Sequence, residues 1–253
     1  MGGQFKLEGK IAIVTGASRG IGESIARSFA EHGAKVVLTA RKQETLEKVA
    51  LSIREAGGEA IAIACHTGKL EMITALYEAV MEKYGRVDVL VNNAATNPYF
   101  GPALHISESA YDKTFQVNTK GYFFMAQKAA SIMVEQNGGS IVNVASIAGL
   151  QSVPMQAVYG MSKAAVILMT RALARELGSA NVRCNAICPG LTETKFAKVL
   201  IETEAIYEMA LTSIPANRHA QPGEIAGAAL YLASDAASYT TGAVLTVDGG
   251  HTT

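Results

Sequence analysis

The segment Ile11-Ala12-Ile13-Val14-Thr15-Gly16-Ala17-Ser18-Arg19-Gly20-Ile21-Gly22 decides the fold of this 253-residue chain. Its first five residues form an apolar, β-branched run that is typical of a buried strand, and a glycine-rich turn and a helical pattern follow directly. Glycines in such a unit let the backbone approach a pyrophosphate, whose charge then lies at the helix N-terminus. The segment therefore predicts a dinucleotide site built from Gly16, Ser18, Arg19, Gly20, Ile21 and Gly22.

The same alternation of short apolar runs and helical patterns continues along nearly the whole chain, which is typical of βαβ units. Strands are predicted at 11–15, 35–40, 60–65, 87–92, 140–146, 182–188 and 244–247. Helices are predicted at 21–32, 43–56, 69–84, 107–136, 157–178 and 222–234. Because the strands are continuous apolar runs, helices are expected on both faces of the sheet. The pattern predicts an α/β fold with a doubly wound, seven-stranded parallel sheet in one domain, 1–253.

Composition excludes several classes of function. The chain balances 22 Lys and Arg against 22 Asp and Glu, so it offers no basic field for nucleic acid or an anionic membrane surface. Its 3 cysteines lack the spacing of a disulfide framework or a zinc site, so no metal is expected. The N-terminal residues lack the apolar core of a signal peptide. We expect a cytoplasmic protein.

The end of the second predicted strand bears on the choice of nucleotide. NAD-binding proteins usually place an acidic residue here to bond the ribose 2′-hydroxyl, whereas this chain has Ala40, Arg41 and Lys42. A guanidinium can hold a 2′-phosphate through paired, charge-assisted hydrogen bonds, and Arg19 can add a second positive charge. These residues favour NADP(H). The alternative is that Glu44 is the ribose acid, although it also suits the first turn of a helix.

A second group of residues can carry acid–base chemistry. Tyr159 and Lys163 are spaced i, i+4 in a helical pattern, so both side chains lie on one helix face, and Ser146 ends the preceding strand. A free tyrosine has a pKa of about 10, and a nearby cation is expected to lower it. Tyr159 could then exchange a proton with an alkoxide or an alcohol, while Ser146 bonds the same oxygen.

The segment at about 191–218 is an irregular insertion after a strand end. It mixes charged residues with the apolar residues Phe196, Leu200, Ile201, Ile206, Tyr207 and Met209. Loops outside the carboxyl ends of strands bind ligands in such folds, so this segment is either a surface helix pair or a substrate lid.

Seven pieces of sequence, taken together and in order, carry a family resemblance. They are the glycine turn, Asn92-Asn93-Ala94-Ala95, Asn118, Ser146, Tyr159 with Lys163, Pro189-Gly190, and Thr241-Gly242 with Val247-Asp248-Gly249-Gly250. The chain resembles the short-chain dehydrogenase/reductase family over nearly all of its length. The resemblance implies a Rossmann-type domain that transfers hydride between a nicotinamide cofactor and a carbonyl or alcohol carbon.

The resemblance also implies roles for individual residues. Tyr159 would be the acid/base, Ser146 would orient the carbonyl, Lys163 would bind the nicotinamide ribose, and Asn118 would hold a water in the proton relay. Further cofactor contacts are implied for Asn93, Pro189, Gly190, Thr192 and Thr194. Two positions depart from the family pattern. Ala95 replaces a common glycine, and His66-Thr67 stands where many members place an aspartate against the adenine, so His66 either contacts the adenine or is a surface residue.

Loop residues point further to a subgroup. Cys65-His66-Thr67-Gly68, Asn97-Pro98-Tyr99-Phe100-Gly101, Pro189-Gly190-Leu191 and Asp235-Ala236-Ala237-Ser238-Tyr239 resemble the NADPH-dependent carbonyl and retinal reductases. A largely hydrophobic pocket is expected from Ala95, Phe100, Leu150, Val153 and Met155. The expected activity is therefore carbonyl reduction with NADP(H).

Three alternatives remain open. The chain could be an NAD-dependent alcohol dehydrogenase, a 3-oxoacyl thioester reductase, or a catalytically silent cofactor-binding scaffold. Relatives in the family are commonly tetramers, so the resemblance also implies a homotetramer in which the long helices near 107–136 and 157–178 pair between subunits.

Overall fold

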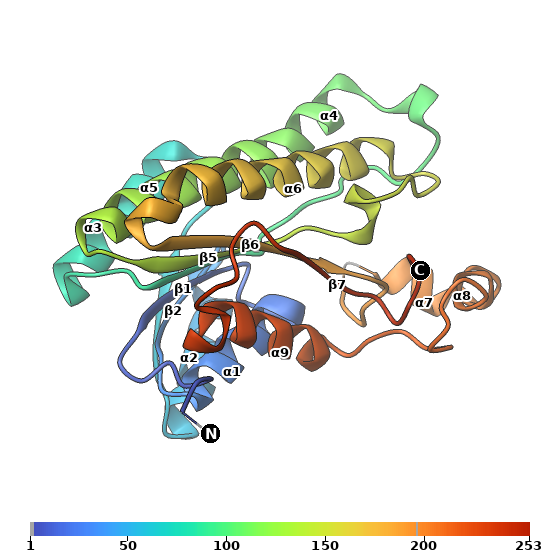
Figure 1. Ribbon diagram of the computed structural model, residues 1–253. Coiled ribbons are helices and arrows are strands. Elements are labelled where there is room, and N and C mark those ends of the chain that lie inside the picture. The colour runs from blue at the N-terminus through green and yellow to red at the C-terminus, as the bar shows by residue number, and fades with distance from the viewer. Residues whose placement is uncertain (1–2, 196) are drawn as a thin grey trace.

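One parallel sheet organises the protein, whose computed structural model describes residues 3–195 and 197–253. The strand order is β3-β2-β1-β4-β5-β6-β7, and every neighbouring pair is parallel (Figure 1). The strands are β1 (Ile11–Thr15), β2 (Lys35–Ala40), β3 (Glu59–Ala64), β4 (Val89–Asn92), β5 (Gly139–Val144), β6 (Val182–Pro189) and β7 (Val244–Val247). The predicted doubly wound, seven-stranded fold is confirmed, with each strand end within two residues of its predicted place.

Helices cover both faces of the sheet, as Figure 1 shows. They are α1 (Gly20–Glu31), α2 (Gln43–Glu55), α3 (Leu70–Tyr84), α4 (Glu108–Phe115), α5 (Tyr122–Glu135), α6 (Ala157–Leu177), α7 (Lys198–Glu202), α8 (Glu204–Leu211) and α9 (Pro222–Ala233). In Figure 1, α3, α4, α5 and α6 form the upper layer, and α1, α2 and α9 form the lower one. The short helices α7 and α8 lie at the same end of the molecule as the C-terminus.

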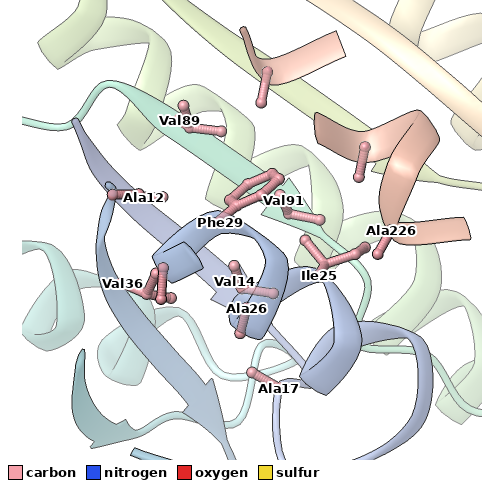
Figure 2. Close-up of a cluster of buried hydrophobic side chains, with 14 of the residues drawn as sticks. Ala12, Val14, Ala17, Ile25, Ala26, Phe29, Val36, Val89, Val91 and Ala226 are labelled. Carbon is pink, nitrogen blue, oxygen red and sulfur yellow. The ribbon is translucent and has the colours of Figure 1, made fainter. Parts of the chain in front are cut away.

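The alternation of side chains along β1 explains why both layers are needed. Ala12 and Val14 point into the cluster that α1, α2 and α9 complete, whereas Ile11 and Ile13 point into the cluster formed with α3 and α5. Figure 2 shows the first cluster, where Phe29 of α1 is fully buried against the sheet. Burying a side chain of this size stabilises the fold by about 1.5–3 kcal/mol.

The long helix predicted at 107–136 is interrupted. It begins as α4, passes through a π-helical turn at Gln116–Gly121 and continues as α5. The turn lies against Thr67, because a Cβ at Gly121 would come within 2.5 Å of the Thr67 carbonyl oxygen. Single π turns inside helices occur mostly at functional sites, and this one carries Asn118.

One stretch of the described chain, Ala157–Ala180, is long and apolar enough to cross a membrane by length and composition alone. It consists of α6 and the 3₁₀ turn after it, and 44% of its most apolar window is buried within this fold. The core helix of a doubly wound sheet passes the same test, so this composition is weak evidence of a membrane span.

Candidate active site

A cleft of about 790 Å³ opens at the carboxyl ends of the strands. From β1 the chain adds β2 and β3 on one side of the sheet, and it then adds β4 and the later strands on the other side of β1. The cleft lies at this reversal of strand order, where doubly wound sheets bind their ligands. The predicted site residues that line it are Gly16, Ser18, Arg19, Gly20, Ile21, Arg41, His66, Thr67, Asn93, Ser146, Tyr159, Lys163, Pro189, Gly190, Thr192 and Thr194. Gly22 and Asn118 were predicted as site residues too, and they lie behind this surface.

Hydrogen bonds to the loop after β4 hold the glycine turn in place. The Thr15 hydroxyl accepts from the backbone N–H groups of Asn93 and Ala94, at 2.8 and 3.0 Å, and the Asn93 side chain donates to the Thr15 carbonyl at 2.8 Å. Gly16 and Gly20 have φ of +66° and +59°, a conformation that side chains disfavour. The turn is thus shaped by its glycines and fixed by the neighbouring loop.

The first turn of α1 fits an anionic group. Arg19 at the N-cap makes no side-chain capping bond, so the first N–H groups of this 12-residue helix lack a side-chain acceptor from that position. Gly20 and Ile21 of this first turn line the cleft. Thr194 closes over the turn, since a Cβ at Gly20 would lie 3.1 Å from its methyl group. These residues fit the pyrophosphate of a dinucleotide.

Gly22 supports the turn from behind. A Cβ at this position would collide with the Asn93 side chain and the Gly16 carbonyl. We expect Gly22→Ala to lower the free energy of unfolding by about 1–3 kcal/mol and to weaken dinucleotide binding, because the turn must open to admit the methyl group. Urea unfolding and fluorescence titration measure the two effects. Gly223→Ala in α9, where a Cβ meets open space, is the control, and equal behaviour of the two variants would contradict this account.

Positive charge gathers at the end of the cleft where β2 and β3 finish. Arg19, Arg41 and Lys113 line it, and no Asp or Glu is among the described lining residues. His66 accepts from the Gly68 N–H at Nδ1 (3.0 Å), and its Nε2 lies 3.1 Å from the Lys113 ammonium. Burial, followed by the charge of Lys113, lowers the pKa of His66. His66 is therefore part of the cleft wall and not a free surface residue, and Lys113 is a neighbour that sequence reasoning missed.

The residues predicted for acid–base chemistry come together deeper in the cleft. Tyr159 and Lys163 are 8% and 1% exposed, and the Tyr159 and Ser146 side chains are hydrogen-bonded. The Lys163 ammonium donates to the Val144 carbonyl at 2.7 Å and to the Tyr122 hydroxyl at 3.3 Å, and it lies 5.8 Å from the centre of the Tyr159 ring. The Lys163 side chain therefore bonds both Tyr122 and the carboxyl end of β5. Sequence reasoning missed Tyr122.

The expected lowering of the tyrosine pKa is wrong for the protein alone. Burial raises the pKa of Tyr159 to about 12, and the hydrogen bond with Ser146 opposes this only in part. Burial also lowers the pKa of Lys163 to about 7. Above that pH the lysine is largely uncharged and cannot stabilise a Tyr159 phenolate. Desolvation of both side chains therefore outweighs the charge interaction that the i, i+4 spacing suggested.

Asn118 fastens the loop after β4 to α6. Its amide exchanges two hydrogen bonds with the backbone of Thr96, at 2.8 and 2.9 Å, and also donates to the Ser162 hydroxyl at 3.1 Å. The side chain is fully buried and held by three protein groups. A role in holding a relay water stays a prediction.

The segment after β6 forms the opposite wall. The Gly190 N–H donates to the Val247 carbonyl at 2.9 Å, and a Cβ on Gly190 would lie 2.8 Å from the Cα of Asp248, so only glycine fits here. The Thr192 hydroxyl donates back to the Gly190 carbonyl at 3.0 Å. The segment is therefore anchored to the end of β7 before it reaches Thr194.

The remaining wall is mostly apolar. Its members include Ala95, Phe100, Val153, Met155, Leu191, Leu200, Met209 and Ile214. Leu150, predicted for this pocket, instead is 43% exposed and lies outside the lining. Of the predicted lid residues, Phe196 and the side chain of Ile206 lie outside the described residues, while Leu200 and Met209 face the cleft. His251 near the C-terminus also lines the cleft, although no sequence signal marked it.

Comparisons with known proteins agree with this geometry. The family model described as enoyl-(acyl carrier protein) reductase matches residues 16–252. Dehydrogenase/reductase SDR family member 4 of Oryctolagus cuniculus is 37% identical over 96% of this chain and 94% of its own length. The chain is a short-chain dehydrogenase/reductase. The 3-oxoacyl-(acyl-carrier-protein) reductase FabG of Thermotoga maritima is 39% identical over 97% and 99%.

Solved structures of this short-chain dehydrogenase/reductase family match the whole fold. A putative NAD(P)-dependent gluconate 5-dehydrogenase from Beutenbergia cavernae, with bound NADP, is 37% identical and has a TM-score of 0.94 over 98% of both chains. A 7α-hydroxysteroid dehydrogenase in complex with NADH is 36% identical, with a TM-score of 0.94 over 99% of this chain and 97% of its own. A nicotinamide dinucleotide is therefore the cofactor class of this oxidoreductase, and relatives differ in which one they hold.

Proposed function

We propose that this oxidoreductase transfers hydride between NADP(H) and a ketone or secondary alcohol, and that it acts as a carbonyl reductase on largely hydrophobic substrates. The charge of the cleft carries the choice of cofactor: Arg19, Arg41 and Lys113 line it and the described lining contains no carboxylate. An acidic side chain after β2 would repel a 2′-phosphate, whereas guanidinium groups bind one in a charge-assisted, bidentate way. The lack of an acid at Ala40 also removes the usual partner of the NAD ribose.

The reaction divides among the residues already described. A bound nicotinamide supplies or accepts the hydride. Ser146 holds the substrate oxygen, and Tyr159 donates its proton to that oxygen during reduction or removes it during oxidation. Lys163, which is 1% exposed, holds the nicotinamide ribose.

Arg41 provides the most direct test of the cofactor assignment. We expect Arg41→Ala to weaken NADPH binding by about 10–100-fold, because one charge-assisted pair with the 2′-phosphate is lost. NADH binding should stay within about threefold of the wild-type value. Fluorescence titrations with both nucleotides at one ionic strength measure this. Lys42→Ala removes a neighbouring charge that does not line the cleft and is the matched control. Wild-type protein that binds NADH as tightly as NADPH would favour the NAD-dependent alternative.

The apolar wall supports the proposed substrate class. Phe100, Val153, Met155 and Met209 line the same cleft as Tyr159, and small-molecule pockets with such apolar walls bind the apolar parts of their ligands. Met155 has a φ of +64°, and strained non-glycine residues gather at ligand sites. Some structural relatives are named gluconate dehydrogenases, so a substrate panel should contain aryl ketones and sugar acids side by side.

Reduction of a 3-oxoacyl thioester is the second candidate. It is supported by the 39% identity with the Thermotoga maritima reductase. An acetoacetyl thioester in the same panel separates the two activities. A protein that binds NADPH but turns over no member of the panel would be the silent scaffold.

We also propose a cytoplasmic homotetramer. The layer formed by α4, α5 and α6 carries large apolar side chains exposed to solvent, which is typical of a surface that another subunit covers. Among them are Tyr111, Phe123, Met161 and Leu168, exposed by 38%, 41%, 51% and 68%.

A further inference from the structure

The cleft wall after β7 contains a histidine that the proposed reaction does not use. His251 lines the cleft, and its Nδ1 is shut off from solvent with no hydrogen-bond partner among the described residues. Most buried side-chain polar atoms have a partner, and a buried N–H without one is the rarest case. We therefore assign the proton of the neutral ring to Nε2, the nitrogen left to donate to a ligand in the cleft.

A hydrogen-bonded turn holds the ring in place. The Asp248 carboxylate accepts from the N–H groups of Gly250 and Thr252, both at 2.9 Å, and from the Thr252 hydroxyl at 2.7 Å. The Ala216 N–H donates to the Gly249 carbonyl at 3.0 Å, which fastens the turn to the loop after α8. The bonds of Asp248 lie within the turn, and Asp248 is not among the described lining residues. His251 is therefore presented to the cleft on fixed support.

The strand order places His251 relative to the reacting groups. Along the carboxyl edge of the sheet, Arg41 follows β2, Ser146 follows β5 and His251 follows β7. Neighbouring strands lie about 4.8 Å apart, so β7 is about 10 Å from β5. His251 thus lies on the side of Ser146 that faces away from Arg41, and in Figure 1 the C-terminus lies at the same end as α7 and α8. A substrate with its carbonyl at Ser146 would reach His251 with a group about 10 Å away.

The surroundings of His251 favour an anionic group. Ser213 lines the same cleft and its hydroxyl makes no hydrogen bond within the described part of the chain. It adjoins Ile214, whose methyl group would lie 3.1 Å from a Cβ on Gly249, so the loop that carries Ser213 packs on the turn that carries His251. Lys195 adds a positive charge to the lining, in which the structure describes no Asp or Glu. A carboxylate accepts strong hydrogen bonds from donors of these kinds.

We propose that His251 and Ser213 bind the carboxylate of an oxo acid whose carbonyl lies at Ser146 and Tyr159. This inference rests on the proposed function, since it needs the carbonyl at that end. The chain between the two groups would contact the apolar wall, which includes Leu200, Met209 and Ile214. His251 is then a specificity-determining residue, and the substrate class is an amphipathic oxo acid.

Binding to the NADP⁺-saturated protein tests the subsite without turnover, because a ketone and NADP⁺ are both oxidised and no hydride can pass. Benzoyloctanoic acid and its methyl ester are titrated by calorimetry. In the wild type, we expect the acid to bind about tenfold more tightly than the ester, as for one hydrogen bond to a charged group. In His251→Leu, the two should bind equally. His251→Gln keeps an N–H donor and should retain the preference within about threefold.

Two controls test the geometry. His105→Leu removes an exposed histidine outside the cleft lining and should behave as the wild type. Benzoylpropionic acid, whose carboxylate is too close to its carbonyl to span two strand spacings, should bind His251→Leu and the wild type equally.

Kinetics with NADPH separate this proposal from the proposed function. His251→Leu should raise KM for benzoyloctanoic acid about tenfold, leave kcat within about twofold and leave both constants for the ester unchanged. An acid that binds the wild type no more tightly than its ester, or a preference that survives in His251→Leu, would overturn the subsite. A preference that depends on His251 in a protein that reduces neither ketone would support the subsite and overturn the carbonyl reductase function.

Discussion

Replacing Tyr159 by Phe should reduce kcat by about 10²–10⁴-fold, because the change removes the only atom of this side chain that can pass a proton to the substrate oxygen. The ring, which is 8% exposed, stays in place, so the shape of the cleft should not change. NADPH affinity should remain within about threefold of wild type, since the loss is confined to the transition state. Steady-state kinetics with any ketone from the panel, together with NADPH titration, measure both quantities.

The matched control is Tyr77→Phe. The Tyr77 hydroxyl of α3 is buried, like that of Tyr159, and donates to the Met125 carbonyl of α5 at 2.7 Å, and Tyr77 is not among the residues that line the cleft. Removal of this hydroxyl should lower the free energy of unfolding by about 1–3 kcal/mol, because the Met125 carbonyl loses a buried donor. It should leave kcat unchanged. Turnover by Tyr159→Phe at the control's rate would remove Tyr159 from the chemistry and require another proton donor.

Replacing Lys163 by Met should abolish measurable turnover and change how stability depends on pH. Burial lowers the pKa of Lys163 from 10.5 to about 7, so between these values the unfolded chain binds more protons than the folded one. Stability therefore rises with pH across this window, and the cost of the buried charge is fully present below about pH 7. Each pKa unit represents ~1.4 kcal/mol, so this shift changes the free energy of unfolding by a few kcal/mol across the window.

Comparison of variants isolates this contribution from other titrating groups. The stability of Lys163→Met relative to wild type should be most favourable near pH 6 and should decline by a few kcal/mol toward pH 10, by the same linkage. Lost hydrogen bonds to the Val144 carbonyl and the Tyr122 hydroxyl add a cost that does not vary with pH. Urea unfolding at both pH values measures the difference. Lys195→Met, on an exposed side chain, should show no such trend, and a flat difference for Lys163→Met would refute the buried, neutral lysine.

The sequence predicted the sheet well because the central strands β2, β1, β4, β5 and β6 are mostly buried on both faces. A short, mostly apolar run such as 35–40 is typical of a strand that helices cover on both faces. The observed β2 has the predicted bounds. The predicted cofactor turn also follows from local sequence, since Gly16 and Gly20 adopt the positive φ that glycine permits. Most predicted site residues line one cleft because strand ends in a parallel sheet share an edge.

Features that depend on contacts between distant segments could not be predicted. The apolar spacing of 107–136 continues through the π turn, whereas the close approach of Gly121 to Thr67 joins segments that are far apart in the sequence. The pKa values of Tyr159 and Lys163 depend on burial under neighbouring strands, which the i, i+4 spacing does not report. The place of Leu150 outside the cleft likewise depends on how the loop after β5 turns.

The strand order has a consequence for how this enzyme can change. Because β4 follows β1 in space, the chain divides at the cleft into a shorter part that ends near residue 88 and a longer part that begins with β4. Arg19, Arg41 and His66 belong to the shorter part, whereas Lys113, Ser146, Tyr159 and the apolar wall belong to the longer one. Most of the cationic wall and all of the apolar wall are therefore encoded in separate stretches of the gene. Recombination at this boundary can exchange Arg19, Arg41 and His66 and leave the apolar wall unchanged.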